Sequence, residues 1–402
     1  MKKGIVMDKY ILITGGELFN KGAQAMTYVT VNEIYARWPE KKIVLLSSGD
    51  AKRDESFLSN LTFDVIPSLR VRDVVALRLR ALQKKRIRKD DIVFQKLCLY
   101  FDNADALLDI SGYALGSNWG ADVAFSYLIR IIAAKGYHIP VYLLSQSFGP
   151  FEYTGWKKIA VNLLSRHYLK YCKIIMAREE EGRVLLQNQY KLKNVLKTDD
   201  IVLESIRLNP DKIYKNIPIE KDIQIDNPSI AIIPNKKNMI YMQKHDALAL
   251  YQTIVERVLQ HGIKIYLIYH AMEDQSICRE IKAGFADNEN VIVVENELNC
   301  FEFNKIIGQF RFIIASRYHS IVNAYRNGIS ALVIGWATKY KELLEVYHQE
   351  QFQLDVRNGI ERQQLINALE TMIKSYKENN TTIQSVTSQI QQQNVFDLIH
   401  LN

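Results

Sequence analysis

Short apolar runs that alternate with helix-like stretches constrain the fold of this 402-residue chain more than any other feature. In the first half, the runs that predict strands are 10–14, 42–46, 106–110, 140–145 and 173–177. Short runs of this kind are typical of parallel strands that are buried on both faces and joined through helices. Helices are expected near 23–37, 122–135, 156–170 and 179–189, whereas 48–101 has no clear pattern. The first half therefore predicts a doubly wound α/β domain.

A second series of the same kind follows Asn227 and Pro228. Its predicted strands are 229–234, 264–269, 291–294, 312–315 and 331–335, with helices near 246–260, 273–286, 301–309, 320–327 and 341–346. Between the two series, 208–227 contains two prolines and many charges without a period, which is typical of a linker. We predict an α/β protein of two Rossmann-like doubly wound domains facing a cleft, at 1–207 and 228–358. A polar helical tail at 359–402 either packs back on the first domain or frays.

The net charge of +8 belongs to one segment rather than to the whole chain. From Leu69 to Lys89 there are nine Lys or Arg side chains and one Asp, so the rest of the sequence is neutral. No recognisable nucleic-acid-binding motif accompanies this run, and we expect no nucleic-acid partner. Its apolar residues recur at helical spacing, at Val71, Val75, Leu79 and Leu82. The segment is therefore either a solvated helix face or a basic amphipathic helix that contacts a membrane peripherally.

The cysteines and the N-terminus indicate a reducing compartment. The four cysteines lie far apart, with no CxxC pair and no His at ligand spacing, so the sequence predicts neither a metal site nor a disulfide framework. The first apolar stretch is too short for a signal sequence or a membrane span. We expect a cytoplasmic protein, located at the inner face of the membrane if the basic segment binds there.

The loops after two of the predicted strands carry candidate ligand-binding residues. In open α/β folds, ligands bind beyond the carboxyl ends of the strands. The first loop offers glycines where the backbone can approach a ligand, although a simple tight turn explains them equally well. The later loop offers aromatic and amide groups suited to a sugar, or to packing alone. The candidates are Gly16, Asn20, Lys21, Tyr113, Asn118 and Trp119.

Basic residues at three further strand ends indicate an anion site. Arg178 follows the strand at 173–177, where it either pairs with the three glutamates that come next or holds an anion. Ser316, Arg317 and His319 follow the strand at 312–315 at the mouth of a helix, and Lys339 comes one βα unit later. Arg can bind a carboxylate or phosphate through two hydrogen bonds, and His can exchange a proton near neutral pH. We interpret this group as functional, although lone histidines are more often structural.

In their order and spacing, these motifs resemble those of the polysaccharide pyruvyl transferase family. The resemblance extends along most of the chain. It rests on Arg178, Lys339 and the segments ITGG (13–16), NKGAQA (20–25), SQSFGP (145–150), TDD (198–200) and SRYHS (316–320). The chain departs from the family pattern at Ala23, where the family commonly carries an acid, and at Ile201, where it usually carries proline. The resemblance implies two Rossmann-like domains similar to the glycosyltransferase type B fold.

The activity that the resemblance implies is transfer of a pyruvyl group from phosphoenolpyruvate to two hydroxyls of a hexose such as galactose. The product is a cyclic pyruvate ketal on a polysaccharide precursor of a capsule or exopolysaccharide, or on a polyprenyl-diphosphate-linked oligosaccharide, and phosphate is released. Arg317 and His319 correspond to the family's donor-binding and catalytic pair. Arg178, Ser316 and Lys339 would help to hold the donor, and the six loop residues would bind the acceptor. Phosphoenolpyruvate is a co-substrate in this scheme, which requires no metal or organic cofactor.

Two other functions fit the same scaffold, because a fold does not fix the chemistry. A nucleotide-sugar-dependent glycosyltransferase of cell-surface polysaccharide synthesis would use Arg317 and Lys339 to hold a diphosphate, with His319 as a bystander. A non-catalytic saccharide-binding protein has little need of Arg, His and Lys at its strand ends.

Overall fold

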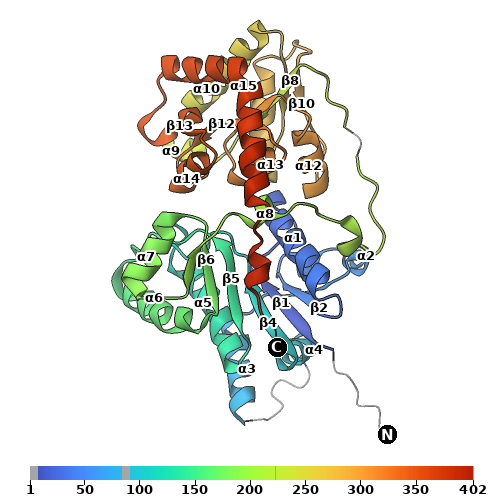
Figure 1. The fold of residues 1–402 in the computed structure, drawn as a ribbon, viewed down its shortest axis with the longest axis vertical. Helices are drawn as coiled ribbons and strands as arrows, with labels where there is room; N and C mark the ends of the chain where they lie inside the picture. Colours follow the sequence, from blue (N-terminus) through green and yellow to red (C-terminus); the bar gives the residue numbers. More distant parts are fainter. Residues whose placement is uncertain (1–7, 84–90, 222, 402) are drawn as a thin grey trace.

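Two parallel β-sheets organise the chain (Figure 1) in the computed structural model, which describes residues 8–83, 91–221 and 223–401. The first sheet has seven strands in the order β3-β2-β1-β4-β5-β6-β7. Its strands are β1 (Tyr10–Thr14), β2 (Lys42–Leu46), β3 (Asp64–Ile66), β4 (Ala104–Asp109), β5 (Val141–Gln146), β6 (Ile174–Ala177) and β7 (Val195–Lys197). The strand order reverses between β1 and β4, which is the arrangement of a doubly wound domain.

Helices cover both faces of the first sheet. One face packs against α3 to α7, whose inward side chains form a core with alternate strand residues such as Leu12 and Leu107. The other face, with Ile11 and Leu108, packs against α1 and α8. The helices are α1 (Lys21–Arg37), α2 (Glu55–Asn60), α3 (Val71–Gln83), α4 (Ile92–Asp102), α5 (Ala121–Gly136), α6 (Gly155–Tyr168), α7 (Glu180–Tyr190) and α8 (Ile201–Glu204).

The second sheet has six strands in the order β10-β9-β8-β11-β12-β13. These are β8 (Ser229–Ile233), β9 (Lys264–Leu267), β10 (Val291–Val293), β11 (Phe312–Ala315), β12 (Ser330–Gly335) and β13 (Gln353–Asp355). Side chains of α10, α11 and α15 cover one face, and those of α12, α13 and α14 cover the other. The helices are α9 (Asn238–Tyr241), α10 (Lys244–Gln260), α11 (Gln275–Ala283), α12 (Cys300–Ile307), α13 (Tyr318–Arg326), α14 (Thr338–Val346) and α15 (Arg362–Ile390).

One hydrophobic core runs continuously from the first domain into the second. It joins α1 and α8 to α12 and α13, and it also includes the end of the chain. After α15 the chain returns to the first domain (Figure 1), where Glu204 accepts a hydrogen bond from the Val395 amide at 2.8 Å. The carbonyl of His400 accepts another from the Tyr142 hydroxyl at 2.8 Å. The C-terminal segment therefore joins the two domains.

The segment between the two series of strands also contacts the first domain. The Tyr214 hydroxyl lies 2.8 Å from the Tyr28 hydroxyl of α1, and the Thr62 amide donates to the carbonyl of Ile213 at 3.0 Å. Part of 208–227 is therefore anchored on the first domain.

The two parallel-sheet α/β domains expected from the sequence are confirmed. Three strands had no apolar run to predict them, namely β3, β7 and β13. Each is only three residues long, lies at a sheet edge and is partly exposed, so it lacks a continuous buried stretch. The unassigned region 48–101 contains α2, β3, α3 and α4. The basic segment from Leu69 to Lys89 forms α3 in its first part, whereas residues 84–89 lie outside the described residues.

No helix within the described ranges has both the length and the apolar character that crossing a bilayer requires.

The C-terminal segment gives a test of the shared core. Phe396 is 2% exposed, so Phe396→Ala removes a buried ring and should lower the free energy of unfolding by about 3 to 5 kcal/mol. Leu398→Ala is the matched control, since Leu398 is 38% exposed and its truncation should change stability little. Urea denaturation followed by circular dichroism measures both. Equal stability of the two variants would contradict the assigned packing of the tail.

Candidate functional site

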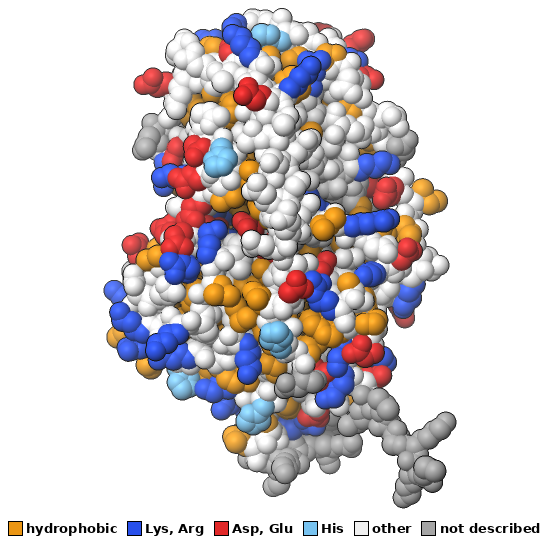
Figure 2. Space-filling view, in the orientation of Figure 1, with side chains coloured by type: hydrophobic (Ala, Val, Ile, Leu, Met, Phe, Trp, Pro, Cys, Tyr) orange, Lys and Arg blue, Asp and Glu red, His pale blue; other side chains and the backbone are white. Residues whose placement is uncertain are grey.

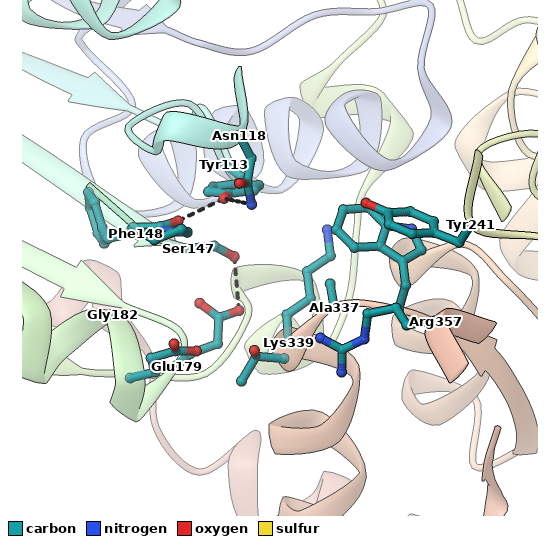
Figure 3. A pocket seen from close by; sticks show the side chains of 15 residues that line it. Tyr113, Asn118, Ser147, Phe148, Glu179, Gly182, Tyr241, Ala337, Lys339 and Arg357 are labelled. Atoms are coloured by element: carbon teal, nitrogen blue, oxygen red, sulfur yellow. Dashed lines mark hydrogen bonds between the residues drawn. The ribbon is translucent and has the colours of Figure 1, made fainter. Parts of the chain in front are cut away.

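A pocket of about 330 Å³ lies between the two domains at the carboxyl ends of their strands (Figure 3). The first domain lines it with Tyr113, Asn118, Ser147, Phe148, Gly149, Pro150, Glu179, Glu181 and Gly182. The second domain lines it with Tyr241, Trp336, Ala337, Thr338, Lys339 and Arg357. The pocket thus occupies the cleft at which open α/β domains bind ligands.

The first-domain wall is rich in hydrogen-bonding groups. The Tyr113 hydroxyl donates to the carbonyl of Gly149 at 2.7 Å and accepts from the Asn118 amide at 3.0 Å. Ser147 donates to Glu179 at 2.9 Å, as Figure 3 shows. These contacts fix the orientation of a carboxylate, a hydroxyl and an aromatic ring at one edge of the pocket.

Lys339 is the most informative group of the second-domain wall. Its side chain is half-buried and extends between the two walls (Figure 3). Among the described residues, the Lys339 ammonium has no hydrogen-bond or ion-pair partner, although it lies 5.1 Å from the Tyr318 ring centre. Burial, and to a smaller degree repulsion by Arg178, lowers the pKa of Lys339 to about 8. Binding of an anion beside this partly buried, unpaired ammonium is therefore favourable.

An aromatic pair stands beside this lysine. Trp336 and Tyr241 stack with ring centres 4.9 Å apart and planes at 29°. The indole N–H of Trp336 is buried and has no hydrogen-bond partner among the described residues. A ligand oxygen is the natural acceptor for such a donor.

Arg178 lies directly behind the first-domain wall rather than in the pocket. It donates to Asp200 at 2.6 Å, to Ser147 at 2.8 Å and to the carbonyl of Gly112 at 2.9 Å. Of the three glutamates that follow it, it approaches Glu179 at 3.8 Å. Arg178 therefore holds Ser147 in place, and its charge is balanced by Asp200.

His319 lies at the interface of the domains, outside the residues that line the pocket. Its Nε2 is 3.7 Å from Asp200 and forms no hydrogen bond within the described part of the chain. Burial lowers the pKa of His319 to about 4, against the opposing attraction of Asp200. The imidazole ring also packs on Gly22, where an added Cβ would come within 2.4 Å of Nδ1. At neutral pH His319 is thus uncharged and in contact with both domains.

Arg317 and Ser316 also lie behind the pocket wall. Arg317 forms a two-point ion pair with Asp274, at 2.7 and 2.8 Å, and a further contact with Glu273. Ser316 is buried and its hydroxyl is 3.0 Å from the Tyr251 hydroxyl. The sequence offered no sign that carboxylates more than 40 residues away would neutralise Arg317.

The residues proposed for the acceptor separate into two groups. Tyr113 and Asn118 line the pocket, and Trp119 stands edge-on to Tyr113 with the Lys237 ammonium 4.5 Å from its ring. The first-loop residues lie elsewhere. Gly16 packs inside the first domain, Asn20 caps α1 through the amide of Gly22, and Lys21 donates to the carbonyl of His270 in the second domain at 2.9 Å.

Several pocket residues were not among the sequence-based candidates. Ser147, Glu179 and Trp336 follow strands β5, β6 and β12, so the strand-end rule could have found them. Tyr241 belongs to the short helix α9, and no sequence pattern near it signals a ligand.

The free cysteines are all buried, and the described residues contain no group of three His, Cys, Asp or Glu side chains arranged to hold a metal.

Known structures share the overall fold of this chain. UDP-GlcNAc 2-epimerase from Methanocaldococcus jannaschii has a TM-score of 0.58 at 13% identity, covering 94% of this chain and 99% of the epimerase. UDP-GlcNAc 2-epimerase from Neisseria meningitidis bound to UDP-GlcNAc gives 0.52 at 12% identity, covering 95% and 98%. A glycosyltransferase from Rickettsia africae gives 0.53 at 12% identity, covering 96% of both chains. The expected fold, similar to glycosyltransferase type B, is confirmed.

Comparison by sequence identifies the family. No curated protein matches the chain. The family model of polysaccharide pyruvyl transferases matches residues 20–338, which include β2 to β12 and every residue of the pocket except Lys339 and Arg357. The chain therefore belongs to the polysaccharide pyruvyl transferase family, and it is a pyruvyl transferase of polysaccharide biosynthesis.

Proposed function

We propose that this enzyme transfers the pyruvyl group of phosphoenolpyruvate to two hydroxyls of a hexose, with galactose the expected acceptor. The acceptor belongs to a polysaccharide or to a lipid-linked oligosaccharide precursor. The observation that carries the proposal is the unpaired Lys339 on the pocket wall. Phosphoenolpyruvate supplies the carboxylate and phosphate that such a cation attracts, and family membership supplies the reaction class.

The donor binds on the second-domain wall in this proposal. Lys339 is there at the start of α14, a helix whose first amides have no side-chain cap. Lys237 adds a second cation, and repulsion by Arg317 contributes after burial to lowering its pKa. An anion bound between Lys339 and Lys237 offsets the repulsion among these cations, and it accepts hydrogen bonds from the free amides at the start of α14.

The acceptor sugar binds on the first-domain wall. Ser147, Glu179 and Asn118 offer hydrogen bonds to its hydroxyls, and Tyr113 offers a ring face for its apolar side. The Glu179 carboxylate accepts hydrogen bonds from sugar hydroxyls and repels the anionic phosphoenolpyruvate. The two walls therefore bind different substrates.

His319 carries the proton in this scheme, which requires the acceptor hydroxyl to reach beyond the pocket lining to the buried Nε2. The first hydroxyl of the sugar adds to the enol carbon while His319 takes its proton, and the imidazolium passes this same proton to the methylene carbon, which becomes a methyl group. The second hydroxyl then forms the second C–O bond as the C–O bond to phosphate breaks, and its proton leaves with the phosphate. Asp200, 3.7 Å from Nε2, stabilises the imidazolium that forms in between. Arg317 stays paired with Asp274 and Glu273 behind the pocket wall, so the donor is held by Lys339 in this scheme.

The direct test is incubation with phosphoenolpyruvate and a panel of aryl and lipid-linked hexosides. Mass spectrometry should find a product heavier by pyruvate less water, with release of one phosphate. A product formed from a nucleotide sugar instead, or thermal stabilisation by UDP-, GDP- or CMP-sugars and not by phosphoenolpyruvate, would contradict the proposal and support a glycosyltransferase.

Replacement of Lys339 tests the donor site. Lys339→Met removes one charge-assisted contact and should weaken phosphoenolpyruvate binding about 10- to 100-fold in isothermal calorimetry. Lys341→Met is the matched control, because Lys341 is exposed on the same helix and lies 3.6 Å from Glu345. Equal affinity of the two variants would remove Lys339 from the donor site.

The pH dependence of donor binding follows from the lowered pKa of Lys339. Below about pH 8 the lysine is protonated and can bind the anion. Above that pH the free enzyme loses the proton, so affinity for phosphoenolpyruvate should fall by up to about tenfold per pH unit. The Lys339→Arg variant keeps a positive charge at this position, so its affinity for phosphoenolpyruvate should not change with pH up to about pH 9. A flat profile for the wild type would be inconsistent with this assignment.

Replacement of His319 tests the proton carrier. His319→Gln keeps a polar side chain without a basic nitrogen and should lower kcat by about 100-fold or more with little change in the Kd for phosphoenolpyruvate. His245→Gln, at a side chain that is 91% exposed, should leave both unchanged. Phosphate release measures kcat, and a wild-type kcat for His319→Gln would exclude the role.

A further inference from the structure

Two helices of the first domain expose apolar stripes to solvent. On α6, Trp156, Ile159 and Leu163 are 67–71% exposed. Their spacing of three and four residues places them on one helix face. On α3, the residues Val71, Val75, Leu79 and Leu82 are 43–77% exposed and also recur at helical spacing. We call these two sets the α6 stripe and the α3 stripe.

The two stripes lie on the same side of the molecule. α3 packs on α5, and α5 packs on α6. All three helices bury their other faces in one core on one face of the first sheet. Their solvent faces therefore point away from the same sheet, with the two apolar stripes separated by the width of α5.

Basic residues continue the α6 stripe. Arg166 and Lys170 are exposed, follow Leu163 at helical spacing, and form no hydrogen bond or ion pair through their side chains among the described residues. From 155 to 173 the sequence has five Lys or Arg and no acidic residue. Figure 2 shows the Lys and Arg side chains gathered over α6 at the lower left, with few carboxylates nearby.

The α3 stripe has the same character. Arg72 is exposed beside Val71, and Arg78 flanks Leu79. Asp73 is buried at the base of the helix, where it pairs with Arg70. Apolar side chains flanked by cations are typical of helices that lie in the interface of an anionic bilayer.

We propose that the outer face formed by the α3 and α6 stripes binds the surface of an anionic lipid bilayer. The amino-terminal end of α6 follows the pocket loop at 147–150, and Trp156 stacks on Phe125 there. Seated in this way, the protein holds the mouth of its pocket beside the bilayer, where a lipid-linked sugar is within reach. The binding itself is independent of the reaction proposed above.

Vesicle co-sedimentation of the full chain tests the proposal. The wild type should sediment with phosphatidylcholine vesicles that contain about one-third phosphatidylglycerol, and much less with phosphatidylcholine alone. Raising NaCl from about 0.1 to about 0.5 M should weaken binding, because salt screens the cations. Equal binding to neutral vesicles would overturn the proposed role of the charges.

Paired variants locate the surface. Ile159→Ser with Leu163→Ser should weaken vesicle binding more than tenfold, because two exposed apolar side chains that the bilayer would bury are lost. Arg166→Glu with Lys170→Glu should weaken it at least 25-fold, about fivefold for each removed charge. The controls are Ile219→Ser with Ile240→Ser and Lys374→Glu with Lys377→Glu, which alter exposed residues away from α3 and α6.

Two outcomes would reject the bilayer as the partner. If both α6 variants bind vesicles as strongly as the wild type does, this face is not the surface that binds the bilayer. A wild type that is dimeric by light scattering and becomes monomeric in Ile159→Ser with Leu163→Ser would show that a second copy covers it. All variants should keep the wild-type unfolding temperature and phosphate release with a soluble acceptor, so loss of binding is distinguishable from loss of fold or activity.

Discussion

The buried ion pair of Arg178 and Asp200 is the contact on which most of the site depends. Burying two charges is costly unless they are well hydrogen-bonded, and here Arg178 also binds Ser147 and the carbonyl of Gly112. Its guanidinium lies 4.7 Å from the ring centre of Tyr318 in the other domain. One cation thus fixes a pocket hydroxyl, directs Asp200 toward His319 and packs the two domains together. Arg178 is held by these contacts and Arg357 is paired with Asp355, so the unpaired cation among the residues that line the pocket is Lys339.

The domain interface combines a continuous apolar core with polar contacts made at helix ends. The Cys300 amide, at the start of α12, donates to Gln24 at 2.7 Å, and Glu342 accepts from the first amides of α7. Such amides lack partners within their own helices, so a side chain from the opposite domain satisfies them at little cost. The start of α14 at the pocket has no side-chain cap, and in the proposed function a ligand anion accepts hydrogen bonds from its amides.

The fold was largely predictable from the sequence, because central parallel strands such as β1, β2 and β11 are continuous apolar runs. The edge strands β3, β7 and β13 and the region around α2 to α4 were not, since their burial depends on neighbours distant in the chain. At the site, strand ends identified Lys339, Tyr113 and Asn118 as residues near the cleft. They could not show that Arg317 pairs with Asp274 or that Lys21 donates to the carbonyl of His270, because these partners are set by tertiary packing. Tyr241 comes from a four-residue helix with no local signature.

The distribution of charge within the pocket bears on how the reaction is oriented. Carboxylates Glu179 and Glu181 stand on the first-domain wall, and Lys339 stands on the second. In the proposed reaction, the first wall would repel the anionic donor and the second would attract it, which would turn its phosphate and carboxylate toward Lys339 and its enol carbon toward the acceptor. A neutral sugar meets no such repulsion and gains hydrogen bonds from the carboxylate side. Two domains of opposite local charge can in this way orient two substrates in one cavity of about 330 Å³.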